Sequence, residues 1–130
     1  MSAGVTWTAA AAVASGSAFG ALCRWGAGLW LNARWQGFPL GTLFVNVVGG
    51  LLIGAAIAWF ETRPFDHLRL FVTTGMLGGF TTFSAFSAES LMLLEGGQWS
   101  LALAHTVAHV LGALACVALG VVVMRALAGP

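Results

Sequence analysis

Charge is the scarcest property of this 130-residue sequence, in which 7% of the residues are charged and 59% are hydrophobic. It has four acidic residues and five basic ones, all of them arginines, so lysine is absent. A water-soluble domain of this size needs far more polar surface. The nearly neutral balance includes no run of basic residues, which argues against a nucleic-acid partner.

Clusters of residues that carry chemistry are also missing. The two cysteines, Cys23 and Cys116, lie far apart in apolar segments, which is typical of small buried thiols and not of a metal or redox pair. The sequence shows no Ser/His/Asp ordering and no pair of acidic residues in an apolar stretch. We therefore expect a protein that is not an enzyme.

What the sequence does contain is long apolar stretches. A helix rises 1.5 Å per residue, so about 20 apolar residues cross a bilayer core about 30 Å thick. Four stretches have that length: residues 5–31, 40–60, 68–94 and 99–124. Because only short connections remain, the sequence predicts an all-α membrane protein, with residues 1–130 forming a single domain of four transmembrane helices.

The arginines give little information about orientation, which is normally set by an excess of basic residues in cytoplasmic loops. Four crossings place Arg63, Arg69 and Arg125 on the side of both termini, and Arg24 and Arg34 on the other side. This weak bias leaves two interpretations open. The termini have a slight preference for the cytoplasm, or the chain inserts both ways and two copies meet antiparallel.

Small residues recur at a spacing of four in every predicted helix. In lipid, helices associate through close backbone approach, and this spacing permits it. The residues are Gly16 and Gly20, Gly50 and Gly54, Gly75 and Gly79, and then Ala108, Gly112, Cys116 and Gly120. They predict tight packing and carry no information about a transported substance.

Polar side chains within the apolar stretches need either a protein partner or a water-filled path. Thr42 and Asn46 lie one helical turn apart, as do His105 and His109. For Asn46 alone, a hydrogen bond between helices is the simpler interpretation, whereas the whole set fits a polar path at least as well. The histidines are either neutral residues bonded to neighbouring helices or part of that path. Arg24, near the end of the first helix, is expected to extend toward the lipid headgroups.

The third apolar stretch predicts a helix that is broken near its middle. Gly78 and Gly79 are followed by β-branched and hydroxylated residues from Thr81 onward, and both kinds weaken a helix interior. Non-helical backbone at membrane depth is tolerated only where protein buries it or where it lines a cavity. Its carbonyls could hold a cation, and its amides or hydroxyls an anion. Phe83 and Phe86 then share one helical face, where they either pack or direct electropositive ring edges at an anion.

Three motifs in this chain resemble those of the Fluc (CrcB-type) fluoride channels of bacteria. They are GALCRW at residues 20–25, GTLFVNVVGG at residues 41–50 and GGFTTFSAFSAE at residues 78–89. Their order and spacing extend the resemblance over almost the whole chain. It implies a fluoride-selective channel in the inner (plasma) membrane, through which fluoride leaves the cell passively, relieving its toxicity. It also implies a dual-topology antiparallel homodimer with two pores, surrounded by membrane lipid.

The resemblance further implies roles for individual residues. A fluoride pathway would be lined by Arg24, Thr42, Asn46, Phe83, Ser84, Phe86, His105 and His109. A structural sodium ion at the centre of the dimer would be held by the backbone carbonyls of Gly78 and Thr81 from both subunits. The two histidines depart from the family pattern, in which a tyrosine and then a serine occupy these positions.

Two other functions fit parts of the sequence. Small multidrug exporters are also four-helix dual-topology dimers, but they need an acidic residue in the first helix to carry protons, and residues 5–31 contain none. A structural membrane subunit would use the polar residues only to join helices. The fluoride channel accounts for more of the motifs and is the leading hypothesis.

Overall fold

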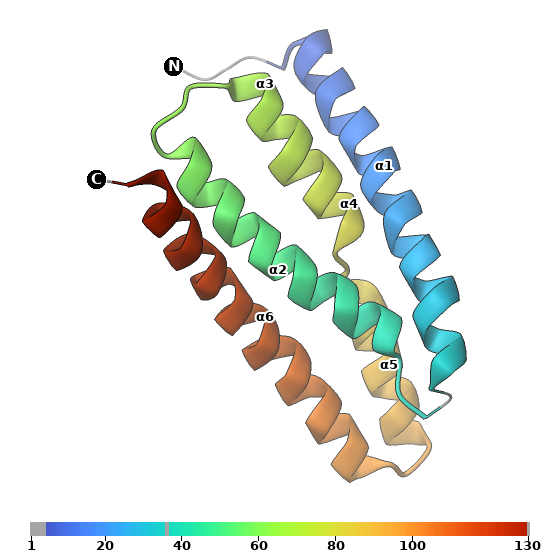
Figure 1. Ribbon diagram of the computed structural model, residues 1–130. Helices are drawn as coiled ribbons and strands as arrows, with labels where there is room; N and C mark the ends of the chain where they lie inside the picture. Colours follow the sequence, from blue (N-terminus) through green and yellow to red (C-terminus); the bar gives the residue numbers. More distant parts are fainter. Residues whose placement is uncertain (1–4, 36, 130) are drawn as a thin grey trace.

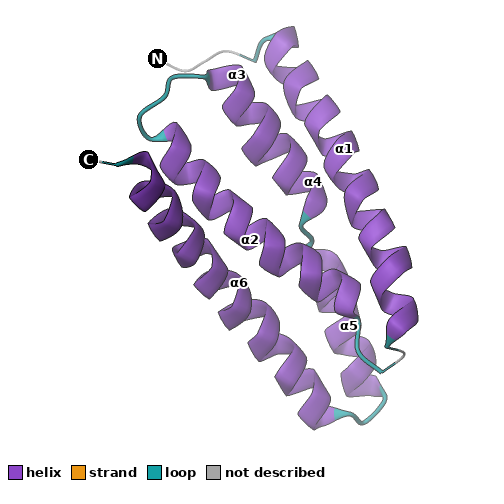
Figure 2. Ribbon diagram, in the orientation of Figure 1, coloured by secondary structure: helices purple, strands orange, loops and turns teal. Residues whose placement is uncertain are grey.

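The computed structural model describes residues 5–35 and 37–129, and the regular structure in this part of the chain is helical, with no strand. Four long helical segments lie side by side, and the chain reverses direction between them (Figure 1). As a result, α1 begins and α6 ends at the same end of the molecule. Short loops make the connections (Figure 2). The predicted all-α architecture of four segments is confirmed.

Three of the segments are continuous helices. They are α1 (Trp7–Leu31), which leads into the short 3₁₀ turn η1 (Asn32–Arg34), α2 (Leu40–Phe60) and α6 (Trp99–Ala128). The bounds of α2 coincide with the predicted stretch 40–60, whereas α6 continues past the predicted end at residue 124. Among the described helices, α2 and α6 are long and apolar enough to cross a membrane.

The third segment is assembled from shorter pieces. They are α3 (Asp66–Arg69), the π-helical turn η2 (Leu70–Leu77), α4 (Gly78–Phe80) and α5 (Phe83–Glu95). Two residues separate α4 from α5, and the helix axis is interrupted there (Figure 1). The first pieces pack along α1, while α5 packs against α6. The third segment therefore packs against α1 before the break and against α6 after it.

Glycines allow the helices to approach one another closely. A Cβ atom at Gly54 would overlap the carbonyl of Val117 on α6, and one at Gly120 would overlap that of Leu51 on α2. The same relation joins α1 to the third segment, where a Cβ atom at Gly79 would overlap the backbone of Ser17. These contacts confirm the packing expected from the small-residue spacing.

Gly112 differs from Gly120 on the same helix. A Cβ atom at Gly112 would lie 3.5 Å from a methyl group of Val47, which is an ordinary van der Waals contact. This part of the α2–α6 interface therefore has room for a side chain. The difference between Gly112 and Gly120 provides a matched pair for testing the packing.

Candidate functional site

The break in the third segment lies at Thr81 and Thr82, both of which have extended backbone. Gly78 and Gly79, which were expected to weaken the helix, are themselves helical, and the break comes just after them. β-branched residues suit extended backbone better than a helix interior, which accounts for the position. Thr82 then starts α5, because its Oγ1 accepts a hydrogen bond from the N–H of Ala85 at 3.2 Å.

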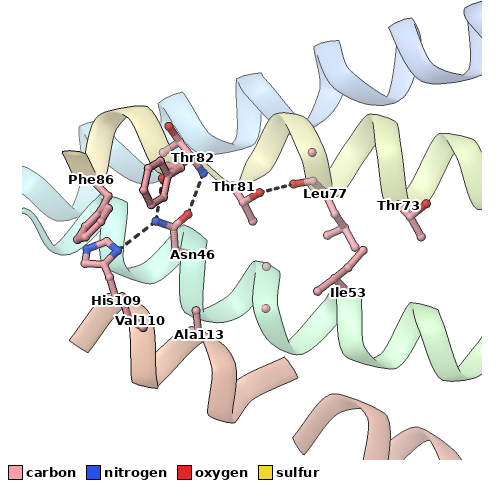
Figure 3. Close-up of a pocket in the computed structure, with 14 residues that line it drawn as sticks. Asn46, Ile53, Thr73, Leu77, Thr81, Thr82, Phe86, His109, Val110 and Ala113 are labelled. Atoms are coloured by element: carbon pink, nitrogen blue, oxygen red, sulfur yellow. Dashed lines mark hydrogen bonds between the residues drawn. The ribbon is translucent and has the colours of Figure 1, made fainter. Parts of the chain in front are cut away.

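Asn46, in the second turn of α2, satisfies the backbone at the break (Figure 3). Its Oδ1 accepts a hydrogen bond from the N–H of Thr82 at 2.8 Å, and its Nδ2 donates one to the carbonyl of Thr82 at 2.9 Å. Leaving either backbone group buried and unpaired would cost about 1–3 kcal/mol. The two bonds also fix the orientation of the amide, because exchanging its oxygen and nitrogen would create two mismatched contacts.

This fixed amide determines the tautomer of His109 on α6. Nδ2 of Asn46 lies 3.1 Å from Nδ1 of His109. An amide nitrogen only donates hydrogen bonds, so Nδ1 must accept one and a neutral imidazole carries its proton on Nε2. His109 is 4% exposed, and its Nε2 has no hydrogen-bond partner in residues 5–35 and 37–129. The site therefore contains a buried N–H donor without an acceptor.

His105 lies one turn before His109 and belongs to a second polar group. Its ring is fully buried, with Nδ1 3.0 Å from Oγ of Ser90 and Nε2 3.3 Å from Oε2 of Glu89. The other carboxylate oxygen of Glu89 accepts a hydrogen bond from the hydroxyl of Thr42. The partly buried carboxylate is thus held by groups from α2 and α6.

Aromatic rings surround both imidazoles. The ring of Phe86 is stacked on His105 at 5.2 Å between centroids and lies 4.7 Å from His109, and the imidazoles are 4.4 Å apart. Phe38 contacts the ring of His105 edge-on at 5.3 Å. Phe83 lies 5.5 Å from Phe86 but is 78% exposed. Of the two phenylalanines, only Phe86 is built into the protein interior.

Two cavities meet at the break. The first, of about 460 Å³, is lined by Asn46, Phe83, Phe86 and His109, together with Gly78 and Thr81. The second, of about 520 Å³, is lined by Arg24 and Thr42. Thr82 lines both cavities, so the extended backbone separates them. The structure thus distributes six of the predicted pathway residues over two adjoining spaces.

The other two predicted pathway residues are placed differently. His105 is fully buried against Phe38 and Phe86. Ser84, in the first turn of α5, is exposed, and its hydroxyl lies 3.3 Å from that of Thr82. Both contact residues at the break: His105 packs against Phe86, and Ser84 lies beside the hydroxyl of Thr82.

The expectation that Arg24 extends toward the lipid headgroups was wrong. Its Nε donates a hydrogen bond to the carbonyl of Gly79 at 3.0 Å, and the contact is partly buried. The break ends the helix before the residue whose N–H would have bonded this carbonyl, so the guanidinium supplies the missing donor. Arg24 therefore faces the break from α1.

The break also leaves two carbonyls available. Within the described part of the chain, no backbone N–H donates to the carbonyl of Gly78 or of Thr81. Thr82 and Ala85, whose N–H groups would have been the helical partners, bond to Asn46 and to the Thr82 hydroxyl. Oxygen atoms of this kind can bind a cation, so the residues present fit the predicted sodium ion.

The sequence predicted no role for three residues of the site: Thr82, Glu89 and Ser90. An acidic residue inside an apolar helix is itself a functional signal, and Glu89 could have been found in this way. Thr82 acts mainly through its backbone, which its side chain does not reveal. Ser90 could not have been singled out from the sequence, because serine and threonine are frequent where membrane helices pack together.

These observations define a class of protein. Large apolar side chains such as Leu22, Leu114 and Leu127 are exposed on the outside, at 64%, 64% and 77%. Both imidazoles are buried, and the amide of Asn46 and the carboxylate of Glu89 beside them are partly buried. Exposed apolar surface of this extent marks contact with lipid or protein. The arrangement is that of a helical membrane protein with a polar interior.

Comparison with known proteins identifies the family. The model of the family described as CrcB-like protein, Camphor Resistance (CrcB), matches residues 11–121, so the chain belongs to this family. A protein of Thiobacillus denitrificans named fluoride-specific ion channel FluC is 49% identical over 115 residues, which cover 87% of this chain and 93% of the relative. The proteins of the same name from Chromohalobacter salexigens and Pseudomonas aeruginosa are 46% and 45% identical, covering 93% and 95% of this chain and 93% and 98% of the relatives.

Proposed function

We propose that this protein is a fluoride-specific ion channel, and not an enzyme, through which fluoride leaves the cell passively and its toxicity is relieved. The names of the similar proteins support this proposal. The structural observation that carries it is the buried, unpartnered Nε2–H of His109. An unpaired buried donor costs about 1–3 kcal/mol, and an anion that accepts from it recovers this cost through a charge-assisted hydrogen bond.

The proposed path uses the residues around both cavities. Arg24 supplies positive charge to the second cavity and concentrates anions there. Ser84 contributes a hydroxyl, Thr42 lines the second cavity and holds Glu89 through its own hydroxyl, and Asn46 holds the extended backbone in place. Phe83 and Phe86 offer electropositive ring edges at the first cavity.

The negative charge of Glu89 would repel fluoride if it were unpaired. It is held between Thr42 and His105, whose ring nitrogen lies 3.3 Å from the carboxylate. His105 therefore supports the path by pairing with the carboxylate of Glu89, while His109 donates a hydrogen bond from Nε2–H to the anion. This division of roles assigns different functions to two histidines that sequence spacing treats alike.

The proposed functional unit is a dual-topology antiparallel homodimer in the inner (plasma) membrane, in which all four segments of each chain cross the lipid and two pores form. The exposed ring of Phe83 and the weak arginine bias support a second copy that covers the first cavity. A structural sodium ion at the dimer centre would be held by the carbonyls of Gly78 and Thr81, which receive no backbone N–H in the described residues.

Efflux of fluoride from liposomes tests the function. Vesicles containing the purified protein are loaded with potassium fluoride, a potassium ionophore is added, and external fluoride is followed with an electrode. We expect fluoride efflux well above that of empty vesicles, and no chloride efflux. His109→Phe keeps the ring volume and removes the Nε2–H donor, so its fluoride efflux should be slower. Efflux at the level of empty vesicles from the folded parent protein would refute the proposal.

A further inference from the structure

The residues Glu89, His105 and His109 have a second chemical capacity that fluoride conduction does not use. Each offers one ligand atom, and the three atoms all lie within 4.8 Å of one another. We propose that these side chains bind one divalent transition-metal ion, with Zn²⁺ as the probe, and that the bound ion blocks the anion path. The blocking step rests on the proposed channel function, whereas metal binding does not.

The donor set suits such an ion. Two imidazole nitrogens and a carboxylate oxygen are common zinc ligands, and three protein ligands leave one position of a tetrahedral ion open for water. Ligand atoms around a tetrahedral zinc ion lie roughly 3.3–3.5 Å apart, given bond lengths of roughly 2.0–2.2 Å. Nε2 of His105 and Oε2 of Glu89 are already 3.3 Å apart. Only a modest inward movement of His109 is needed to complete the set.

Neighbouring groups already orient two of the ligands. The hydroxyl of Ser90 lies 3.0 Å from Nδ1 of His105, leaving Nε2 of that ring directed at Glu89. The hydroxyl of Thr42 bonds the other carboxylate oxygen. Supporting hydrogen bonds of this kind fix the tautomer and the direction of metal ligands. The cluster therefore has its outer shell in place without a metal ion.

His109 provides the independent observation that a ligand is missing. Its Nε2 is buried and unpartnered in the described part of the chain, while its Nδ1 contacts Asn46. When a metal takes the lone pair of Nε2, the proton of the neutral ring moves to Nδ1, which then faces another donor. Metal binding therefore breaks the hydrogen bond between Asn46 and His109 and turns two N–H donors toward each other, a cost that the metal–ligand bond has to offset. It also removes the Nε2–H donor from the anion path.

An entry route exists on the side of Glu89. This residue lines an open cavity of about 390 Å³, together with Phe38 and Gln98, between the α1–α2 loop and the α5–α6 turn. The carboxylate side chain is 21% exposed, whereas His105 behind it is fully buried. An ion arriving from this end of the molecule meets the negatively charged ligand first and the two imidazoles next.

Calorimetric titration of the purified protein in detergent with Zn²⁺ tests binding without reference to transport. We expect one Zn²⁺ per chain, and affinity at least about tenfold lower in His105→Ala, His109→Ala and Glu89→Gln, since even supporting groups have effects of that size in metal sites. His67→Ala is the matched control, because His67 bonds Thr8 near the start of α1. Glu89→Gln preserves shape and keeps the test decisive if an alanine variant does not fold. Equal affinity in the parent and in Glu89→Gln, or loss of binding in His67→Ala, would overturn the proposal.

The same variants test the block in liposomes. Added Zn²⁺ should slow fluoride efflux by at least about tenfold in the parent and in His67→Ala, and a chelator should restore it, because occupancy removes a ligand group from the path. His109→Ala should be insensitive to Zn²⁺ relative to its own rate without metal. Zn²⁺ that binds in the calorimeter but leaves parent efflux unchanged would overturn the block. If the parent conducts no fluoride, the channel function fails while the calorimetric result still decides the metal site.

Discussion

Asn46 bonds both backbone polar groups of Thr82, accepting from its N–H at 2.8 Å and donating to its carbonyl at 2.9 Å. A single side chain on α2 thus replaces the helical partners that the break takes away from the third segment. The same amide reaches His109 on α6, so three segments meet at one residue.

Asn46→Asp should fold and lose most of its fluoride efflux, at least about tenfold. The aspartate still accepts from Thr82 N–H, but its second oxygen faces the Thr82 carbonyl and places a negative charge in the path. Asn46→Ala removes the same donor without adding charge, and it also removes the acceptor of the Thr82 N–H. Each backbone group left unpaired costs about 1–3 kcal/mol, so the alanine variant should be the less stable one. Efflux measured side by side should be lower for the aspartate. Equal rates in the two variants would show that charge is not what stops the ion.

Thr82→Ala should lower the free energy of unfolding by about 1 kcal/mol, the usual effect of removing a helix N-cap. The Thr82 hydroxyl accepts from the N–H of Ala85 at the start of α5, and alanine has no group to replace it. Thr82→Ser keeps the hydroxyl and should unfold like the parent. Denaturant titration in detergent followed by circular dichroism measures all three, and a serine variant as unstable as the alanine one would contradict the capping role.

Phe83→Ile and Phe86→Ile should each reduce fluoride efflux at least about tenfold, because isoleucine fills much of the space without an electropositive ring edge. The two variants should differ in stability. Phe86 contacts both imidazoles and is 8% exposed, so its variant should lose about 0.5–1.5 kcal/mol, whereas the exposed Phe83 should lose little. Unchanged efflux in both variants would mean that the rings only pack.

Gly120→Ala should destabilise the fold by about 1–3 kcal/mol, the range for overpacking a tight interface. The added methyl group would overlap the backbone of Leu51 on α2. Gly112→Ala is the control on the same helix, since its methyl group would lie 3.5 Å from Val47, and alanine is the better helix former. The free energy of unfolding should therefore fall in Gly120→Ala and rise in Gly112→Ala. A similar fall in both variants would contradict the assigned contacts.

The sequence was informative wherever a single segment determines the outcome. The apolar stretch at residues 40–60 coincides with α2, because its length and composition decide its helical extent. Glycine and threonine composition predicted the break, although its position follows the threonines and not the glycines. Close approach at Gly54 and Gly120 followed from residue size alone.

Contacts between distant segments could not be predicted in the same way. Asn46 and Thr82 are 36 residues apart, and Arg24 and Gly79 are 55 apart, so local patterns contain no sign of either bond. Arginine side chains near helix ends generally extend toward the lipid headgroups, which is why Arg24 was expected there. In the folded chain its Nε bonds the carbonyl of Gly79 at the break instead. The different surroundings of His105 and His109 likewise depend on α2 and α5, and not on their own helix.

Positions 46 and 109 differ in how many groups a replacement residue has to satisfy. A residue that replaces Asn46 has to satisfy two backbone groups of Thr82 and a nitrogen of His109 at once, on two other segments. The residue at position 109 has only to place one acceptor near the amide, which a hydroxyl does as well as an imidazole. A change at position 109 therefore leaves the two bonds between Asn46 and Thr82 in place, and histidine there adds one N–H to the protein interior.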